Sequence, residues 1–139
     1  MISRDEVLAN LGRYDQKKAR IGVLASHSAL DTCDGATSEG FNTLAVCQKG
    51  REKTFNNYFR TQRDASGNPV RGVVDDTLIL DRFSDVLLPQ NQEYLMNTNT
   101  LWVPNRSFTS YCSIDQVEND FKVPMVGSRN LLRSEAVSY

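Results

Sequence analysis

Short apolar runs separated by amphipathic segments form the main pattern of this chain. Residues 21–25 and 43–47 are nearly continuous apolar runs, typical of short strands that are buried on both faces of a sheet. Residues 28–39, which lie between them, predict a helix that ends at Gly40. A strand, a helix and a second strand in this order cross over right-handed into a parallel sheet.

The remaining segments extend the same pattern. A helix is predicted over residues 5–14, with Ser3 as its N-cap and Glu6 three residues later. Further strands are predicted at residues 77–81, 101–104 and 123–127, and further helices at residues 83–88, 115–121 (with Asp115 as cap) and 129–135. This order predicts an α/β fold, in which an open, mostly parallel sheet carries helices on both faces.

Two segments do not fit either pattern. Residues 61–72 have the Gly, Pro, Asn and Ser content of a loop or a long hairpin tip. Residues 89–99 are polar, and the only apolar anchor among them is the run from Tyr94 to Met96. Neither segment is assigned to the predicted sheet.

Composition and charge exclude several classes of protein. The 139 residues predict a single domain, and 16 Lys and Arg against 17 Asp and Glu leave no basic excess for binding nucleic acid. No apolar run approaches the ~20 residues that cross a bilayer, and the first residues lack the apolar core of a signal peptide. We therefore expect a cytoplasmic protein without a membrane span.

The cysteine and histidine content argues against metal and disulfide chemistry. Cys33, Cys47 and Cys112 are widely spaced, and His27 is the only histidine. This pattern predicts reduced cysteines that pack as small apolar side chains, with no disulfide framework and no metal site. Trp102, within a predicted strand, is expected in the core.

Three polar turns follow predicted strands, where the carboxyl ends of a parallel sheet bind ligands. They are Ser26-His27-Ser28, Lys49-Gly50-Arg51 and Asn105-Arg106-Ser107. Hydroxyl groups, an imidazole and cationic side chains are the groups that bind a phosphate monoester. Together the turns predict a pocket for an anion or a phosphosugar.

Each of these residues also has a simpler interpretation. His27 is equally compatible with a helix cap or a bond to a backbone carbonyl, and Ser26 and Ser28 are ordinary N-cap residues. Lys49 and Arg51 fit a solvated loop, and Arg106 fits a surface ion pair. The adjacent acids Asp75 and Asp76 are expected to be solvated. The convergence of all three turns on one sheet edge favours the binding site.

Familiar catalytic motifs are absent from the sequence. It contains no dinucleotide fingerprint, no P-loop and no nucleophile elbow, and it lacks the adjacent acids that a phospho-receiver domain carries after its first strand. We therefore predict no catalytic residue in this chain and no turnover by these residues alone.

An ordered set of short motifs resembles the N-terminal domain of the archaeal formate-dependent AICAR ligases, the PurP-type FAICAR synthetases. The set covers nearly the whole chain apart from residues 61–76 and 89–99. It includes Ser26-His27-Ser28-Ala29-Leu30, Gly35-Ala36, Glu39-Gly40-Phe41, Lys49-Gly50-Arg51, Asp81-Arg82-Phe83-Ser84-Asp85, Val103-Pro104-Asn105-Arg106-Ser107-Phe108, Tyr111-Cys112, Val117-Glu118-Asn119 and Phe121-Lys122-Val123-Pro124-Met125. It continues through Gly127, Arg129, Leu131-Leu132-Arg133 and Glu135.

The resemblance implies a fold and a function. Residues 1–139 would form a Rossmann-like pre-ATP-grasp domain of a ligase of purine biosynthesis that joins formate to the amine of AICAR, a ribotide. His27 and Ser107 correspond to family residues that contact AICAR, and Ser26, Ser28, Lys49, Arg51 and Arg106 would be their neighbours. ATP and Mg²⁺ would be held by ATP-grasp domains absent from this chain, and the full-length enzyme would be a homo-oligomer.

One turn departs from the family pattern. The family turn is Pro-His-Gly-Ser-Phe, whereas this chain has Asn105 and Arg106 in place of the His-Gly pair. The larger cation would either add a phosphate contact or narrow the pocket and change the ligand. Ser113 and Ser128 also replace an expected Gly and Asn. The alternative function is a stand-alone phosphosugar-binding or regulatory module without catalysis.

Overall fold

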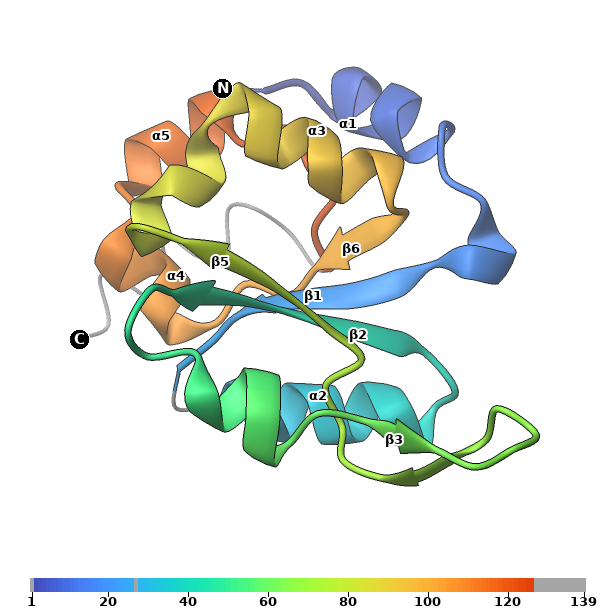
Figure 1. Cartoon of the computed structure of the whole chain (residues 1–139). Coiled ribbons are helices and arrows are strands. Elements are labelled where there is room, and N and C mark those ends of the chain that lie inside the picture. The colour runs from blue at the N-terminus through green and yellow to red at the C-terminus, as the bar shows by residue number, and fades with distance from the viewer. Residues whose placement is uncertain (1, 27, 127–139) are drawn as a thin grey trace.

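Four parallel strands form the centre of the domain (Figure 1). The computed structural model describes residues 2–26 and 28–126. The strands are β1 (Arg20–Leu24), β2 (Asn42–Gln48), β5 (Asp76–Leu80) and β6 (Thr100–Trp102), in the spatial order β5-β2-β1-β6. Every pairing between neighbours is parallel, which confirms the predicted α/β fold.

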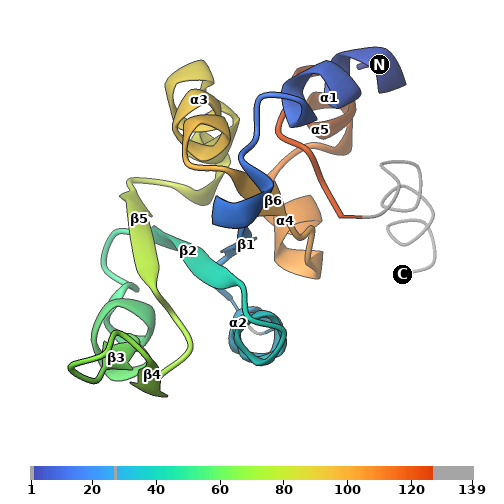
Figure 2. The ribbon, with the colours of Figure 1, turned by 90° about the vertical axis from the view of Figure 1, so that its right-hand side faces the viewer.

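Helices cover both faces of this sheet, as Figure 2 shows. One face carries α2 (Ala29–Ser38) and the single π-helical turn η2 (Thr54–Tyr58), with the hairpin of β3 (Gln62–Arg63) and β4 (Pro69–Arg71) beside them. The other face carries α1 (Arg4–Leu11), α3 (Pro89–Asn97), α4 (Arg106–Tyr111), α5 (Ile114–Asp120) and the 3-10 helix η3 (Phe83–Leu87). A short 3-10 helix, η1 (Gln16–Lys18), precedes β1.

The central strands are apolar on both sides because each side meets a separate core. In β2, Leu44 and Val46 belong to the core under α3 and α4, whereas Ala45 and Cys47 belong to the core under α2. All four are fully buried. The larger core contains Trp102, Phe108 and Phe121 in edge-to-face contacts, with ring centroids 5.1 to 5.7 Å apart.

The polar segment 89–99 contains a helix that the sequence analysis did not assign. Pro89 begins α3 at a position where a missing N–H costs nothing, and Leu95 and Met96 are buried as the expected apolar anchor. Buried Gln92 connects α3 to α5: its amide nitrogen donates to the carbonyls of Leu87 and Asp120 (2.7 and 2.9 Å), and its oxygen accepts from the Lys122 N–H. The polar composition therefore reflects specific buried hydrogen bonds as well as solvent exposure.

Several predicted boundaries differ from the structure. Residues 61–72 do form a hairpin, and Ser3 does cap α1 by accepting from the Glu6 N–H. The N-cap of α5 is Ser113, so the assignment of Asp115 was wrong. The predicted strand at 123–127 is reduced to a single parallel bridge between Trp102 and Met125, because Pro124 has no N–H to donate. Gly127 and the predicted helix at 129–135 lie outside the described residues.

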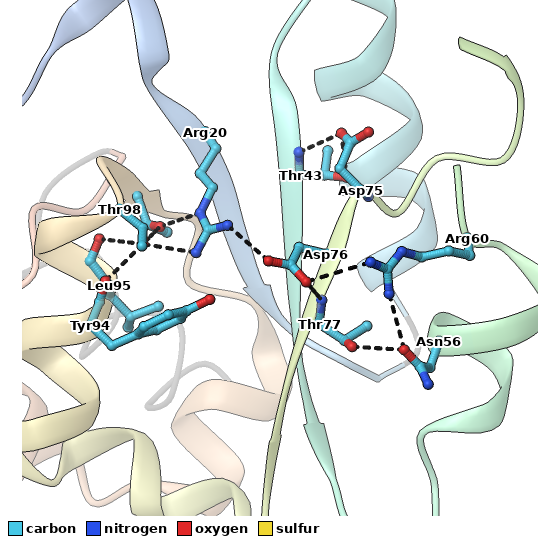
Figure 3. Close-up of polar contacts among 11 residues, drawn as sticks. Arg20, Thr43, Asn56, Arg60, Asp75, Asp76, Thr77, Tyr94, Leu95 and Thr98 are labelled. Atoms are coloured by element: carbon cyan, nitrogen blue, oxygen red, sulfur yellow. Dashed lines mark hydrogen bonds and ion pairs between the residues drawn. The ribbon is translucent and has the colours of Figure 1, made fainter. Parts of the chain in front are cut away.

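The expectation that Asp75 and Asp76 are simply solvated was wrong. Both lie at the amino end of β5, where Asp75 accepts from the backbone N–H of Thr43 at 2.8 Å (Figure 3). Asp75 also pairs with Arg63 at 2.6 Å. Asp76 pairs with Arg20 and Arg60 at 3.5 and 3.6 Å. These contacts hold the amino-terminal edge of the sheet together.

Candidate functional site

The chain reverses its direction of winding next to β1. From β1 it runs through α2 to β2 and then to β5 on one side, and it returns through η3 and α3 to β6 on the other side (Figure 1). After β1 the chain leads to α2, and after β6 it leads to α4 on the opposite face. The carboxyl ends of β1 and β6 therefore form a topological switch point, where open parallel sheets bind their ligands.

Asn105 holds these two strand ends together. Its side-chain nitrogen donates to the backbone carbonyl of Leu24 at 2.9 Å, and its side-chain oxygen accepts from the Phe108 N–H at 3.0 Å. The first bond joins the turn after β6 to the end of β1, and the second caps α4. One side chain thus fixes both the strand ends and the helix that borders them.

Two of the predicted site residues meet here. The hydroxyl groups of Ser26, after β1, and Ser107, in α4, are in direct hydrogen-bond contact although they are 81 positions apart in the sequence. Both residues are partly exposed. Two hydroxyls that bond to each other keep one O–H donor and several lone pairs for a further partner.

A cleft with two lobes opens around this serine pair. The wider lobe, of about 590 Å³, is lined by Ser28, Arg106, Ser107, Ser110 and Tyr111. The narrower lobe, of about 290 Å³, is lined by Ala25, Ser26, Arg51, Phe55, Phe83, Ser107 and Tyr111. Ser107 and Tyr111 border both lobes, so the two lobes lie side by side around these residues.

The charged groups of the cleft are cationic. Arg51 and Arg106 contribute guanidinium groups, and no carboxylate is found among the described residues that line either lobe. Lys49 follows β2 at the same sheet edge, where its N–H donates to the Leu80 carbonyl, but it does not line the cleft. His27 lies outside the described residues. The structure therefore brings together Ser26, Ser28, Arg51, Arg106 and Ser107, five of the seven predicted residues.

Five residues of the cleft were not predicted from the sequence, among them Ala25, which directly follows β1. Ser110 and Tyr111 depend on α4, which the sequence analysis treated as part of a turn, and Phe55 and Phe83 come from η2 and η3. A signal for α4 is present, because Asn105 is a strong N-cap residue followed by six residues without Gly or Pro.

The cysteines are buried away from this chemistry. Cys33, Cys47 and Cys112 have exposures of 0, 0 and 2%, as expected of apolar packing residues. Burial raises the pKa of Cys33 to about 11 and the pKa values of Cys47 and Cys112 to about 12, so all three are protonated at neutral pH. Buried thiols of this kind are poor nucleophiles.

The described residues contain no group of three or more His, Cys, Asp and Glu side chains placed to hold a metal ion. None of the helices found in the same residues is long and apolar enough to cross a membrane.

The fold and the cleft define an α/β domain with a cleft lined by two arginines at the switch point of a parallel sheet. Residues 21–139 match the family described as "Protein of unknown function (DUF1246)", and the chain belongs to this family.

Proteins similar to this chain include archaeal synthetases. Proteins from Methanothermobacter thermautotrophicus and Methanopyrus kandleri, both named 5-formaminoimidazole-4-carboxamide-1-(beta)-D-ribofuranosyl 5'-monophosphate synthetase, are 36% and 38% identical over 97% and 98% of this chain. The aligned region is 34% of each relative, so the chain spans about a third of their length.

This chain is also similar to a protein of known crystal structure. The crystal structure of an IMP biosynthesis protein PurP from Thermococcus kodakaraensis superposes with a TM-score of 0.60 and 26% identity, over 84% of this chain and 32% of that protein. The chain is therefore a homologue of the PurP-type FAICAR synthetases over one third of their length.

Proposed function

We propose that this chain is the amino-terminal, ribotide-binding domain of a ligase that formylates AICAR with formate and ATP to give FAICAR. The observation that carries the proposal is the alignment of 97% of the chain with synthetases of this name at 36% identity. The position of the cleft supports the binding part of the proposal, because it lies at the switch point where parallel sheets hold ligands.

The chemistry of the cleft suits the phosphorylated end of a ribotide. Ser26, Ser28 and Ser107 supply hydroxyl groups, and Arg51 and Arg106 supply fixed positive charge without a competing carboxylate among the described lining residues. Guanidinium and hydroxyl donors are the preferred partners of phosphate oxygens. His27 is placed beside these residues by the sequence, between Ser26 and Ser28, and we propose that it also contacts the ribotide.

The same donor set does not fit Mg²⁺. This ion needs oxygen ligands, usually carboxylates, whereas the described lining of the cleft offers cations and neutral hydroxyls. We therefore assign ATP and Mg²⁺ to the two thirds of the relatives that this chain does not span. The role of this chain is to bind and orient the ribotide, and not to activate formate.

Calorimetric titration with AICAR monophosphate tests the proposal directly. AMP, ribose 5-phosphate and ATP serve as comparison ligands. We expect AICAR monophosphate to bind most tightly, and we expect His27→Ala and Ser107→Ala to weaken its binding without loss of the folded state. Preference for another phosphosugar would favour a stand-alone binding module, and unchanged binding in both variants would contradict the assignment of the site.

A further inference from the structure

We infer that the open edge of β5 is the contact surface for a second copy of this chain, in a two-fold dimer whose two β5 strands pair antiparallel around Ile79. The inference goes beyond the proposed function, and it does not depend on which ligand the cleft binds. It rests on the backbone groups, the exposed side chain and the charges along β5.

The two edges of the four-stranded sheet differ. On the outer side of β6, the Trp102 N–H donates to the Pro124 carbonyl at 2.9 Å, and the Val126 N–H donates to the Trp102 carbonyl at 2.8 Å. On the outer side of β5, no further strand is found among the described residues (Figure 2). An uncovered strand presents backbone groups with which another chain is able to pair.

The pairing of β5 with β2 fixes which backbone groups face outward. The Lys49 N–H donates to the Leu80 carbonyl at 2.7 Å, so the backbone groups of Leu80 face β2. Because these groups alternate along a parallel strand, those of Thr77 and Ile79 face away from β2. The Thr77 N–H donates to the Asp76 carboxylate at 2.9 Å. Ile79 keeps both its N–H and its C=O at the edge, without a partner among the described residues.

The side chain of Ile79 also favours association at this edge. It is 43% exposed, and no other large apolar side chain of the described four-stranded sheet is exposed. Edge strands that avoid association commonly carry a lysine, a proline or a bulge. The sequence of β5, DTLIL, contains neither residue, and its pairing with β2 is regular.

Two antiparallel β5 strands are complementary in one register. With Ile79 opposite Ile79 of the second copy, the two residues exchange a pair of backbone hydrogen bonds. The same register places Leu78 opposite Leu80, and Asp76 opposite Arg82, on each side of the two-fold axis. Opposite charges that face each other across a strand pair stabilise it.

Both members of this charged pair are accessible. Arg82 is exposed, its backbone is extended (φ −137°, ψ 148°), and it forms no ion pair with the described residues. The Asp76 side chain is 45% exposed although it pairs with Arg20 and Arg60. Its carboxylate is therefore able to accept from a further guanidinium.

The same observations limit the register and the size of the assembly. A register centred on Leu78 would place Asp75 opposite Asp81, and like charges directly opposite each other are destabilising. Two-fold pairing occupies the β5 edge of both copies, and residues 124–126 cover the outer side of β6. Association therefore stops at a dimer.

Sedimentation velocity of the complete chain at increasing concentration tests the dimer. We expect a reversible equilibrium between monomer and dimer, with no larger species. Ile79→Lys places two ammonium groups opposite each other, and Arg82→Glu places a carboxylate opposite Asp76. Each should raise the dissociation constant of the dimer by about tenfold or more.

Matched variants control for general changes of charge and apolar surface. Leu8→Lys replaces an apolar residue of α1 that is 49% exposed, and Arg71→Glu reverses an exposed charge in β4. Both lie outside the inferred contact, so neither should change the dissociation constant.

Disulfide trapping locates the two-fold axis. In a hydrogen-bonded antiparallel pair the Cα atoms lie about 5.5 Å apart, within the range that a disulfide spans. Ile79→Cys should therefore give a covalent dimer on oxidation with diamide, whereas Leu8→Cys should remain monomeric. The native thiols of Cys33, Cys47 and Cys112 are buried and do not compete.

Three results would overturn the inference: a chain that stays monomeric at every concentration, a dimer that Leu8→Lys weakens as much as Ile79→Lys does, or equal trapping of the two cysteine variants. Circular dichroism establishes whether Ile79→Lys is folded, and if it is not, Arg82→Glu and the trapping experiment decide. No ligand is needed in these measurements, so their outcome is separate from that of the ribotide titration.

Discussion

Arg20 and Asp76 form an ion pair of 3.5 Å between the first residues of two strands that are not neighbours (Figure 3). Arg20 begins β1 and Asp76 begins β5, and β2 lies between these strands in the sheet. The guanidinium also donates to the hydroxyls of Thr98 and Thr100, at 2.8 Å each, and lies 5.5 Å from the centroid of the Tyr94 ring. The Arg20 side chain therefore links β1, β5, β6 and the carboxyl end of α3.

Replacement of Arg20 should destabilise the domain. The Arg20 side chain is only 12% exposed, so Arg20→Ala removes the donor to the partly buried hydroxyls of Thr98 and Thr100 and one of the two cations that pair with Asp76. We expect a loss of about 2 kcal/mol in the free energy of unfolding, measured by urea denaturation. Arg20→Lys should recover less than half of it, because an ammonium cannot reproduce the planar fork of a guanidinium.

The control for Arg20 is Arg13. Arg13 pairs with Glu93 at 3.1 Å, but both side chains are about half exposed, at 43% and 52%. Water competes for such a pair, so Arg13→Ala should change the stability far less than Arg20→Ala does. Equal losses in the two variants would contradict the structural role assigned to Arg20.

Asn105→Ala should loosen the cleft and lower the stability. The substitution removes the bond to the Leu24 carbonyl and the cap of α4, so we expect a loss of about 1 to 3 kcal/mol in the free energy of unfolding. Asn105→Asp keeps the capping oxygen and removes the donor to Leu24. Urea denaturation of the two variants, together with hydrogen exchange in α4, distinguishes the contribution of the helix cap from that of the bond to Leu24. Faster exchange in α4 is expected only for the alanine variant.

A methyl group added to Gly22 should be costly. Its Cβ would collide with the Thr100 side chain and lie 3.3 Å from the Trp102 ring, both on the neighbouring strand β6. We expect Gly22→Ala to lower the melting temperature and to cost about 1 to 3 kcal/mol, because the fully buried Trp102 has little room to move.

Gly35 provides the matched control for Gly22. It lies within α2, and an added Cβ there meets no atom within 4 Å. Gly35→Ala should therefore leave the stability unchanged or raise it by up to about 1 kcal/mol, since alanine is the better helix former. A melting temperature that falls equally in both variants would contradict the close packing of β1 on β6.

The buried thiols should make the stability depend on pH in the alkaline range. Burial raises the pKa of Cys33 to about 11, and those of Cys47 and Cys112 to about 12, whereas an unfolded thiol ionises near pH 8.5. Unfolding between these values releases protons. The stabilisation is therefore complete below about pH 8.5 and falls by about 1.4 kcal/mol per pH unit for each thiol as the pH rises toward the folded pKa values.

Urea denaturation at pH 7.5, 9 and 10 measures this slope. Removal of one of the thiols in Cys33→Ala should make the decline shallower by about a third. In the folded domain the three thiols should also react slowly with a soluble thiol reagent at neutral pH, and all of them should react quickly in denaturant. A stability that is constant from pH 7.5 to 10 would contradict the burial of these groups.

The sheet was predictable because its strands are buried on both faces. The apolar runs that predicted β1 and β2 exist because Leu44 and Ala45 meet different cores on opposite sides. Helix α3 escaped prediction because its buried Gln92 satisfies three backbone groups, an arrangement in which a polar residue occupies a core position. Hydrophobic patterning cannot identify such a residue, since the required carbonyls come from distant parts of the chain.

The sequence predicts at which edge of the sheet the candidate site lies, but it does not predict which side chains meet there. Topology places the turns after β1 and β6 together, and this rule sufficed to place Ser26 near Ser107. Tyr111 depends on the six-residue helix α4, whose apolar residue Phe108 gives no helical repeat. The direction in which α4 presents Tyr111 to Phe83 is determined by packing on Trp102 and Phe121, not by local sequence.

The position of β6 beside β1 also has a consequence for synthesis on the ribosome. The hydroxyl contact between Ser26 and Ser107 joins residues 81 positions apart, so a nascent chain that has emerged only as far as β5 has β1 as an unprotected edge strand. Such an edge can pair with other chains, and contacts between distant residues form slowly. A ligand that needs both strand ends cannot bind the unfinished chain, and it therefore stabilises only domains whose translation has passed α4.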